Sequence, residues 1–179
     1  NIDSNTAKDF IDNILEPYSE AYNAIKNSNY MSSMGADKVN NILVWLNRID
    51  NSDWVPVALA FYKKNYNDSQ EMYQFIFKLE RLAAFMRTLS WDINRRIERY
   101  AMILTEIETY GSVKELKSLD LTAEEVDAFI AKLNDDVYKM TANKRNYLIL
   151  RLDSFVSNGA ATYDSKVLTI EHVLPQTVK

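Results

Sequence analysis

The chain has 179 residues, of which 47% are hydrophobic and 26% are charged, a composition typical of a globular domain with a sizeable core. Its net charge of −4 excludes a global basic field that attracts nucleic acid, and the absence of cysteine excludes disulfides and thiolate metal sites. We find no signal peptide and no apolar run that could span a membrane, so we expect a cytoplasmic protein without a membrane segment.

Helical periodicity dominates the sequence, and only three glycines and three prolines occur, which favours long helices over many tight turns. We predict helices over residues 4–29, 37–50, 54–66, 69–89, 93–109 and 142–157, a short turn at 112–118, and a helix that opens at Thr122 and closes at Asn134. Pro17 should kink or split the first helix. The predicted fold is mainly α, an irregular multi-helix bundle with one C-terminal β-strand.

Three of these helices carry capping signals at their starts. Asp37 is a plausible cap of the helix over 37–50. Asp68 and Glu71 have the spacing of a capping box, and Thr122 with Glu125 forms a proper one.

Apolar residues at helical spacing predict which faces of the helices are buried. The predicted buried residues include Phe10, Ile14, Tyr18, Ala21 and Ile25 in the first helix, Ile93, Ile97, Tyr100, Leu104 and Ile107 in the helix over 93–109, and Val126, Phe129, Ile130 and Leu133 further on. The helix over 142–157 has apolar residues on most of its sides, which predicts deep burial.

The one histidine of the chain, His172, lies in residues 169–176, which read TIEHVLPQ. β-branched and apolar residues precede it and Pro175 follows it, a pattern typical of a strand that ends at the proline. A neutral imidazole can take a proton from a water that attacks phosphorus, and an adjacent carboxylate can hold Mg²⁺. The chemistry that such a pair of residues could serve is phosphodiester hydrolysis.

This segment resembles the first strand of the HNH, or His-Me finger, nucleases, which carry an acidic residue, a histidine, two apolar residues and a proline. The resemblance is closest to the GmrSD-like restriction enzymes, in which a basic pair, an aromatic residue and an apolar run, here KRNYLILRL at 144–152, precede that motif. Members of that family join a ParB-like N-terminal domain to an HNH domain through helices. By this resemblance, residues 1–160 are a helical domain and residues 161–179 begin an HNH motif.

The resemblance implies that His172 is the general base and that Glu171 is a ligand of Mg²⁺ or Mn²⁺. The family also needs a downstream strand and helix that supply an Asn or His ligand, and only seven residues follow His172. We therefore expect an inactive fragment of a longer hydrolase, with the metal held only in the complete protein. Two alternatives stay open: a solvent-facing carboxylate at Glu171, because strand alternation separates it from its neighbour, and a His172 that only bonds nearby groups.

Five basic residues are candidates for nucleic-acid contact: Arg95, Arg96, Arg99, Lys144 and Arg145. The alternative is a solvated face balanced by interleaved carboxylates, which the acidic residues between 80 and 108 favour. The partners that the resemblance implies are DNA and the ParB-like domain of the same protein. A function of another class is a helical protein-interaction or adaptor module without catalysis, which binds its partner through an apolar groove.

Overall fold

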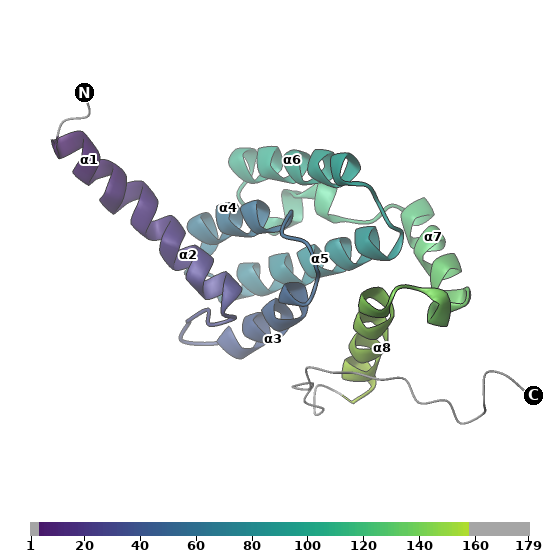
Figure 1. Cartoon of the computed structure of the whole chain (residues 1–179). Coiled ribbons are helices and arrows are strands. Elements are labelled where there is room, and N and C mark those ends of the chain that lie inside the picture. Colours follow the sequence, from purple (N-terminus) through teal and green to yellow (C-terminus); the bar gives the residue numbers. More distant parts are fainter. Residues whose placement is uncertain (1–3, 158–179) are drawn as a thin grey trace, which may run out of the picture. The chain divides into compact units, whose positions relative to one another are not determined.

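A computed structural model describes residues 4–157 of the chain (Figure 1). These residues are mainly helical, as the sequence predicts, and they contain no β-strand. They fall into two compact units, one that ends at Val137 and one that begins at Tyr138. The predicted C-terminal strand, the predicted boundary after residue 160, and both Glu171 and His172 lie outside the described residues.

The first unit contains seven α-helices and three short segments of other helix types among its described residues. Their bounds are α1 Ser4–Phe10, η1 Ile11–Leu15, α2 Glu16–Lys26, α3 Ala36–Asn47, α4 Val55–Asn65, α5 Ser69–Thr88, α6 Ile93–Thr109, η2 Val113–Glu115, η3 Lys117–Leu119 and α7 Ala123–Asn134. The second unit contains α8, Ala142–Val156, preceded by η4, Val137–Lys139, at the junction of the units.

The N-terminal helix is continuous through Pro17, and its geometry changes just before that proline. Ile11–Leu15 forms a π-helical segment, in which the Glu16 N–H bonds the Ile11 carbonyl, five residues back. Proline has no N–H to donate, so a locally widened helix accommodates it without a break. Only Ala21, Ala24 and Ile25 of α2 are buried, because this end of the rod packs on α4 and α3 (Figure 1). The predicted burial of Phe10, Ile14 and Tyr18 is wrong.

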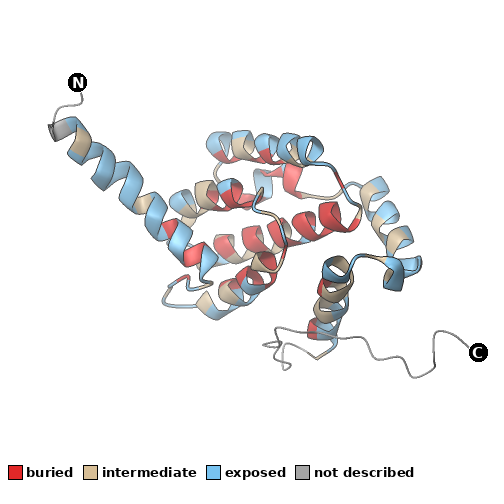
Figure 2. Cartoon of the chain, in the orientation of Figure 1, coloured by how far each residue is buried: buried red, intermediate tan, exposed pale blue. Residues whose placement is uncertain are grey.

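The core of the first unit surrounds α5, whose residues are mostly buried (Figure 2). Helices α3 and α4 pack directly against it, and α4 also contacts α6. The rings of Phe61 and Phe75 stack between α4 and α5, with centroids 3.9 Å apart and planes 4° apart. Trp54 is fully buried at the start of α4, and its Nε1–H donates to the Asn51 carbonyl at 3.1 Å.

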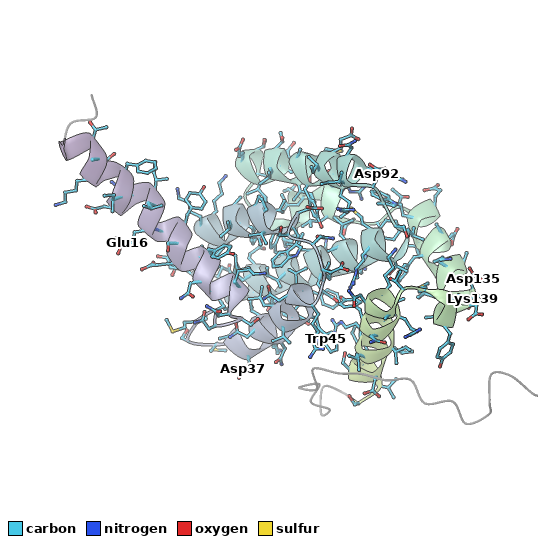
Figure 3. The ribbon with its side chains drawn as sticks, viewed as in Figure 1. Glu16, Asp37, Trp45, Asp92, Asp135 and Lys139 are labelled. Atoms are coloured by element: carbon cyan, nitrogen blue, oxygen red, sulfur yellow. The ribbon has the colours of Figure 1, made fainter. Side chains whose placement is uncertain are left out.

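The capping predictions have mixed outcomes. The Thr122 and Glu125 capping box is present in full. Asp68 caps α5 by accepting from the N–H groups of Gln70 and Glu71. Asp37 is not a cap: it lies in the first turn of α3 (Figure 3), whose N-cap is Gly35 with φ +77°.

Helix α6 is buried along a different stripe from the predicted one. Tyr100, Ile103 and Ile107 are buried, whereas Ile93 and Ile97 are 54% and 52% exposed. Two stripes that differ by a small rotation both satisfy helical spacing, and the neighbouring α4 and η3 select one of them.

Helices α7 and α8 are much less buried than predicted. Val126, Ile130 and Leu133 of α7 are exposed, and no residue of that helix is fully buried. In α8 only Tyr147 and Ser154 are buried, so the predicted deep burial of this helix is wrong.

Candidate functional site

The corner between α5 and α6 carries the predicted arginines. Helix α5 ends near Leu89, Ser90 takes a left-handed conformation with φ +57°, and the Trp91 N–H bonds the Met86 carbonyl at 2.9 Å. Asp92 then caps α6 by accepting from the N–H groups of Asn94 and Arg95 (Figure 3). This turn places Arg95, Arg96 and Arg99 in the first two turns of α6.

Arg96 is a structural anchor between α6 and the α3–α4 connection. Its Nε and Nη2 both lie 2.7 Å from Oδ2 of Asp53, and its Nη1 donates to the Trp91 carbonyl at 2.6 Å. Both side chains of the ion pair are less than one-fifth exposed. The neighbouring Tyr100 has its pKa raised by burial and further by the charge of Asp53, so its hydroxyl stays neutral.

Arg99 is a second anchor, and it holds the segment after η2 and the start of α7. Its Nε donates to the Ser118 carbonyl and its Nη2 to the Asp120 carbonyl, each at 2.6 Å. Its guanidinium also forms a bidentate pair with Glu125, at 3.2 and 3.3 Å. About two turns further along α6, Glu106 accepts from the N–H and hydroxyl of Ser118.

Arg95 differs from these two arginines because its guanidinium lies on an aromatic ring. Its Cζ is 3.5 Å from the centroid of the Trp91 ring, and the residue is exposed. The Trp91 ring meets Phe85 edge-on at 5.3 Å, and Phe85 contacts Phe129 at 6.1 Å. A guanidinium that lies flat on a ring keeps its N–H groups at the rim, where they can bond a phosphate.

Trp91 was not among the functional residues expected from the sequence. Trp91 precedes the N-cap Asp92 and lies outside α6, so the helical i,i+4 rule does not pair it with Arg95, and the sequence holds no simple signal for this contact.

The backbone end of α6 is not a site for an anion. The Asp92 carboxylate occupies the N–H groups that an anion would use, and the bond from the Arg95 N–H is the largest cause that lowers the pKa of Asp92. A phosphate that approaches this corner would meet a carboxylate at the helix end. The Arg95 guanidinium is therefore the group suited to bind phosphate here.

Lys144 and Arg145 lie in the first turn of α8, in the second unit, and both are half-buried. Arg145 donates from Nη1 to the Tyr138 carbonyl at 3.2 Å, which fixes η4 against the start of the helix. The five predicted basic residues thus divide between two compact units, three on α6 and two on α8.

The described residues contain no group of three or more His, Asp or Glu side chains that could hold a metal ion. Glu171 and His172 lie outside them, so their geometry does not enter the description. No helix among residues 4–157 combines the length and the apolar character needed to cross a membrane.

Comparisons with known proteins give no match: no family model, characterised protein or solved structure matches the chain. The class that the described structure defines is a mainly helical protein whose two α6 arginines, Arg96 and Arg99, anchor the fold and whose Arg95 faces solvent.

Proposed function

We propose that this chain is the helical middle region of a GmrSD-like, modification-dependent DNA restriction endonuclease of the cytoplasm. The observation that carries the proposal is the sequence TIEHVLPQ at 169–176, preceded by the basic and aromatic segment at 144–152. The helical fold of residues 4–157 agrees with the helices that join the two domains in that family. The middle region would place a ParB-like domain and an HNH domain relative to each other.

In the complete protein, His172 would act as the general base. It would accept a proton from water while the water oxygen attacks phosphorus, the bond from phosphorus to the leaving sugar oxygen breaks, and that oxygen takes up a proton. Glu171 would hold Mg²⁺ or Mn²⁺ together with ligands supplied beyond this sequence, since hard cations prefer carboxylate oxygen. The metal supplies charge stabilisation for the phosphate oxygens.

Arg95 is our choice among the α6 arginines for a contact with DNA phosphate. Arg96 and Arg99 already donate to carboxylates and carbonyls of the fold, and a phosphate would have to displace those acceptors. Arg95 is exposed, and its guanidinium contacts the ring of Trp91, with Cζ 3.5 Å from the ring centroid. Lys144 and Arg145 stay proposed contacts of the second unit.

The test of the nuclease proposal is DNA cleavage with Mg²⁺ or Mn²⁺ on plain and modified DNA. We expect cleavage by the complete protein, none by the 179-residue chain, and a loss of about 10²–10⁴-fold in the complete protein carrying His172→Ala. Lys166→Ala, six residues before His172, is the matched control and should keep full activity. Cleavage that survives His172→Ala would refute the role of the histidine.

The proposed DNA contact is tested by measuring the affinity of the complete protein for DNA at several salt concentrations. Arg95→Gln should lower the affinity and reduce the slope of log K against log salt by about 0.9, the value for one phosphate contact. Arg81→Gln, an exposed arginine on α5, is the control. Equal slopes for the Arg95 variant and the unchanged protein would refute the proposed contact between Arg95 and a DNA phosphate.

A second candidate function, a helical interaction module, is favoured by one observation. The N-terminal rod exposes a row of large apolar residues: Phe10, Ile11, Ile14, Leu15, Tyr18 and Tyr22. Such a row is typical of a helix that binds another helix, here a second copy of the chain. Analytical sedimentation of the unchanged chain, Ile14→Asp and the control Asn13→Asp tests this. Self-association that is lost only in Ile14→Asp, together with no DNA cleavage by the complete protein, would favour the interaction module.

A further inference from the structure

The apolar row of the N-terminal rod is open at one end and reaches a packed helix at the other. None of residues 6–20 is buried (Figure 2), and along this stretch Phe10, Ile14 and Tyr18 recur every four positions, with exposed fractions of 52%, 43% and 37%. At the inner end, Lys63 of α4 lies over the Tyr18 ring, with Nζ 4.6 Å from the ring centroid, and Ala21 of the next turn is buried. The row therefore continues from a helix interface that already exists.

The charges of the rod are arranged around this row in a specific way. A second set of residues recurs every four positions and carries charge: Lys8, Asp12, Glu16 and Glu20. Each of them stands two residues from a member of the row, which is about 200° of rotation, so this set lies on the opposite side of the helix. Two opposite charges border the row itself, Asp9 beside Phe10 at the outer end and Lys63 over Tyr18 at the inner end.

A surface with an apolar middle and opposite charges at its two ends is complementary to a second copy of itself turned end to end. In an antiparallel pair, Asp9 of each copy comes to the level of Lys63 of the other, whereas a parallel pair places each charge at the level of its own kind. Asp9 and Tyr18 are nine residues apart, about 13 Å along a helix, so Asp9 does not reach Lys63 within one chain. A parallel pair would also bring the packed ends of both rods together. The charges and the packed end both favour the antiparallel arrangement.

We propose that two copies of the chain pair antiparallel through this row. Ile14 meets Ile14 of the second copy at the two-fold axis, Phe10 packs on Tyr18 of the second copy, and Asp9 lies beside Lys63 of the second copy. This inference rests on the second candidate function, self-association of the rod, and adds the orientation and the register. Such a pair is closed, so it presents two copies of the first unit, including two copies of Arg95.

The absence of cysteine from the chain makes disulfide trapping a direct test of the orientation. In the full 179-residue chain, a mixture of Phe10→Cys and Tyr18→Cys should form a disulfide dimer at least about tenfold faster than either variant alone, a margin that corresponds to a tenfold difference in population. In the antiparallel pair, two copies of Phe10 lie eight residues apart, about 12 Å, which exceeds the roughly 7 Å limit for a disulfide. Ile14→Cys should link to itself, and Glu16→Cys, on the opposite side, should not.

A second measurement leaves the apolar row intact. Asp9→Lys and Lys63→Asp each place like charges together, so each should weaken dimerisation in analytical sedimentation by about two- to thirtyfold, the effect of two exposed ion pairs per dimer. The double variant, Asp9→Lys with Lys63→Asp, restores opposite charges and should recover most of that loss. Asp12→Lys, on the opposite side of the rod, makes the same change in charge as Asp9→Lys and should weaken dimerisation less. A double variant as weak as either single variant would overturn the register.

The two experiments separate a failure of this inference from a failure of the function on which it rests. A chain that sediments as a monomer at every concentration would refute self-association of the rod and, with it, the antiparallel pair. A chain that dimerises while Phe10→Cys links to itself as fast as the mixture reacts would refute the antiparallel arrangement alone. DNA cleavage enters neither measurement.

Discussion

Replacing Arg99 by glutamine separates an anchoring role from a role in DNA binding. The guanidinium makes two short bonds to carbonyls and a bidentate pair with Glu125, and both side chains of the pair are only about 15% exposed, at 16% and 14%. Breaking one half of a buried pair costs about 3–5 kcal/mol. In the Arg99 variant, Glu125 still accepts from the Thr122 N–H at 3.0 Å, so its carboxylate keeps one donor. We therefore expect a loss at the lower end of that range, about 3 kcal/mol.

Arg95→Gln is the matched control because it removes an arginine one turn earlier on the same helix. The contact of its guanidinium with the Trp91 ring is worth about 0.5–1 kcal/mol at an exposed position. Urea unfolding followed by circular dichroism should therefore show a much larger loss of stability for Arg99→Gln. Thermal unfolding should show a drop in Tm of about 6–12 °C in a chain of this size. Hydrogen exchange should rise first at Ser118 and Asp120.

A double-mutant cycle with Glu125→Gln identifies the interaction responsible. If the pair carries the effect, the sum of the two single-variant losses should exceed the loss measured in the double variant. An Arg99→Gln chain as stable as the unchanged one, but with weaker DNA binding, would refute the assignment of Arg99 as an anchor and return it to the DNA-binding residues.

Three further predictions concern the stability of the first unit. The folded state lowers the pKa of Asp92, chiefly through the bond from the Arg95 N–H. The ionised Asp92 therefore stabilises the folded state above the unfolded pKa of about 4, and this contribution is lost as pH falls through the lower folded pKa. Asp92→Asn should reduce the loss of unfolding free energy at acid pH, measured by urea unfolding at several pH values. Phe75→Ala should cost about 3–5 kcal/mol in urea unfolding because it empties the stack with Phe61. Gly111→Ala should cost about 1–2 kcal/mol by the same assay, since φ is +79° and no atom within 4 Å obstructs a Cβ.

The features predicted correctly from the sequence are those that depend on a few neighbouring residues. The Thr122 capping box needs only Glu125, three residues away, and the Asp68 cap needs only the two N–H groups that follow it. The Glu71 that completes the spacing does something else: its carboxylate accepts from the Val113 N–H at 2.7 Å, 42 residues away. The spacing of Asp68 and Glu71 predicts the start of the helix correctly, but it does not predict the long-range bond that Glu71 makes.

The faces of α6 show why periodicity alone is insufficient. The predicted stripe through Ile93 and Ile97 and the observed one through Ile103 share Tyr100 and Ile107, so the pattern contains both solutions. The choice follows from where α4 and η3 lie, and their positions depend on contacts between residues far apart in the chain.

Long-range contacts also decide which of the three α6 arginines are anchors of the fold. Arg95, Arg96 and Arg99 are equivalent in sequence as a basic cluster, and the partners that distinguish them are Asp53, 43 residues before Arg96, and Glu125, 26 residues after Arg99. An arginine whose acceptors belong to the fold cannot offer those N–H groups to a phosphate without losing them. A basic cluster on a helix in an acidic protein is therefore weak evidence for DNA binding until the long-range acceptors are known, and here they leave Arg95 as the α6 residue to test first.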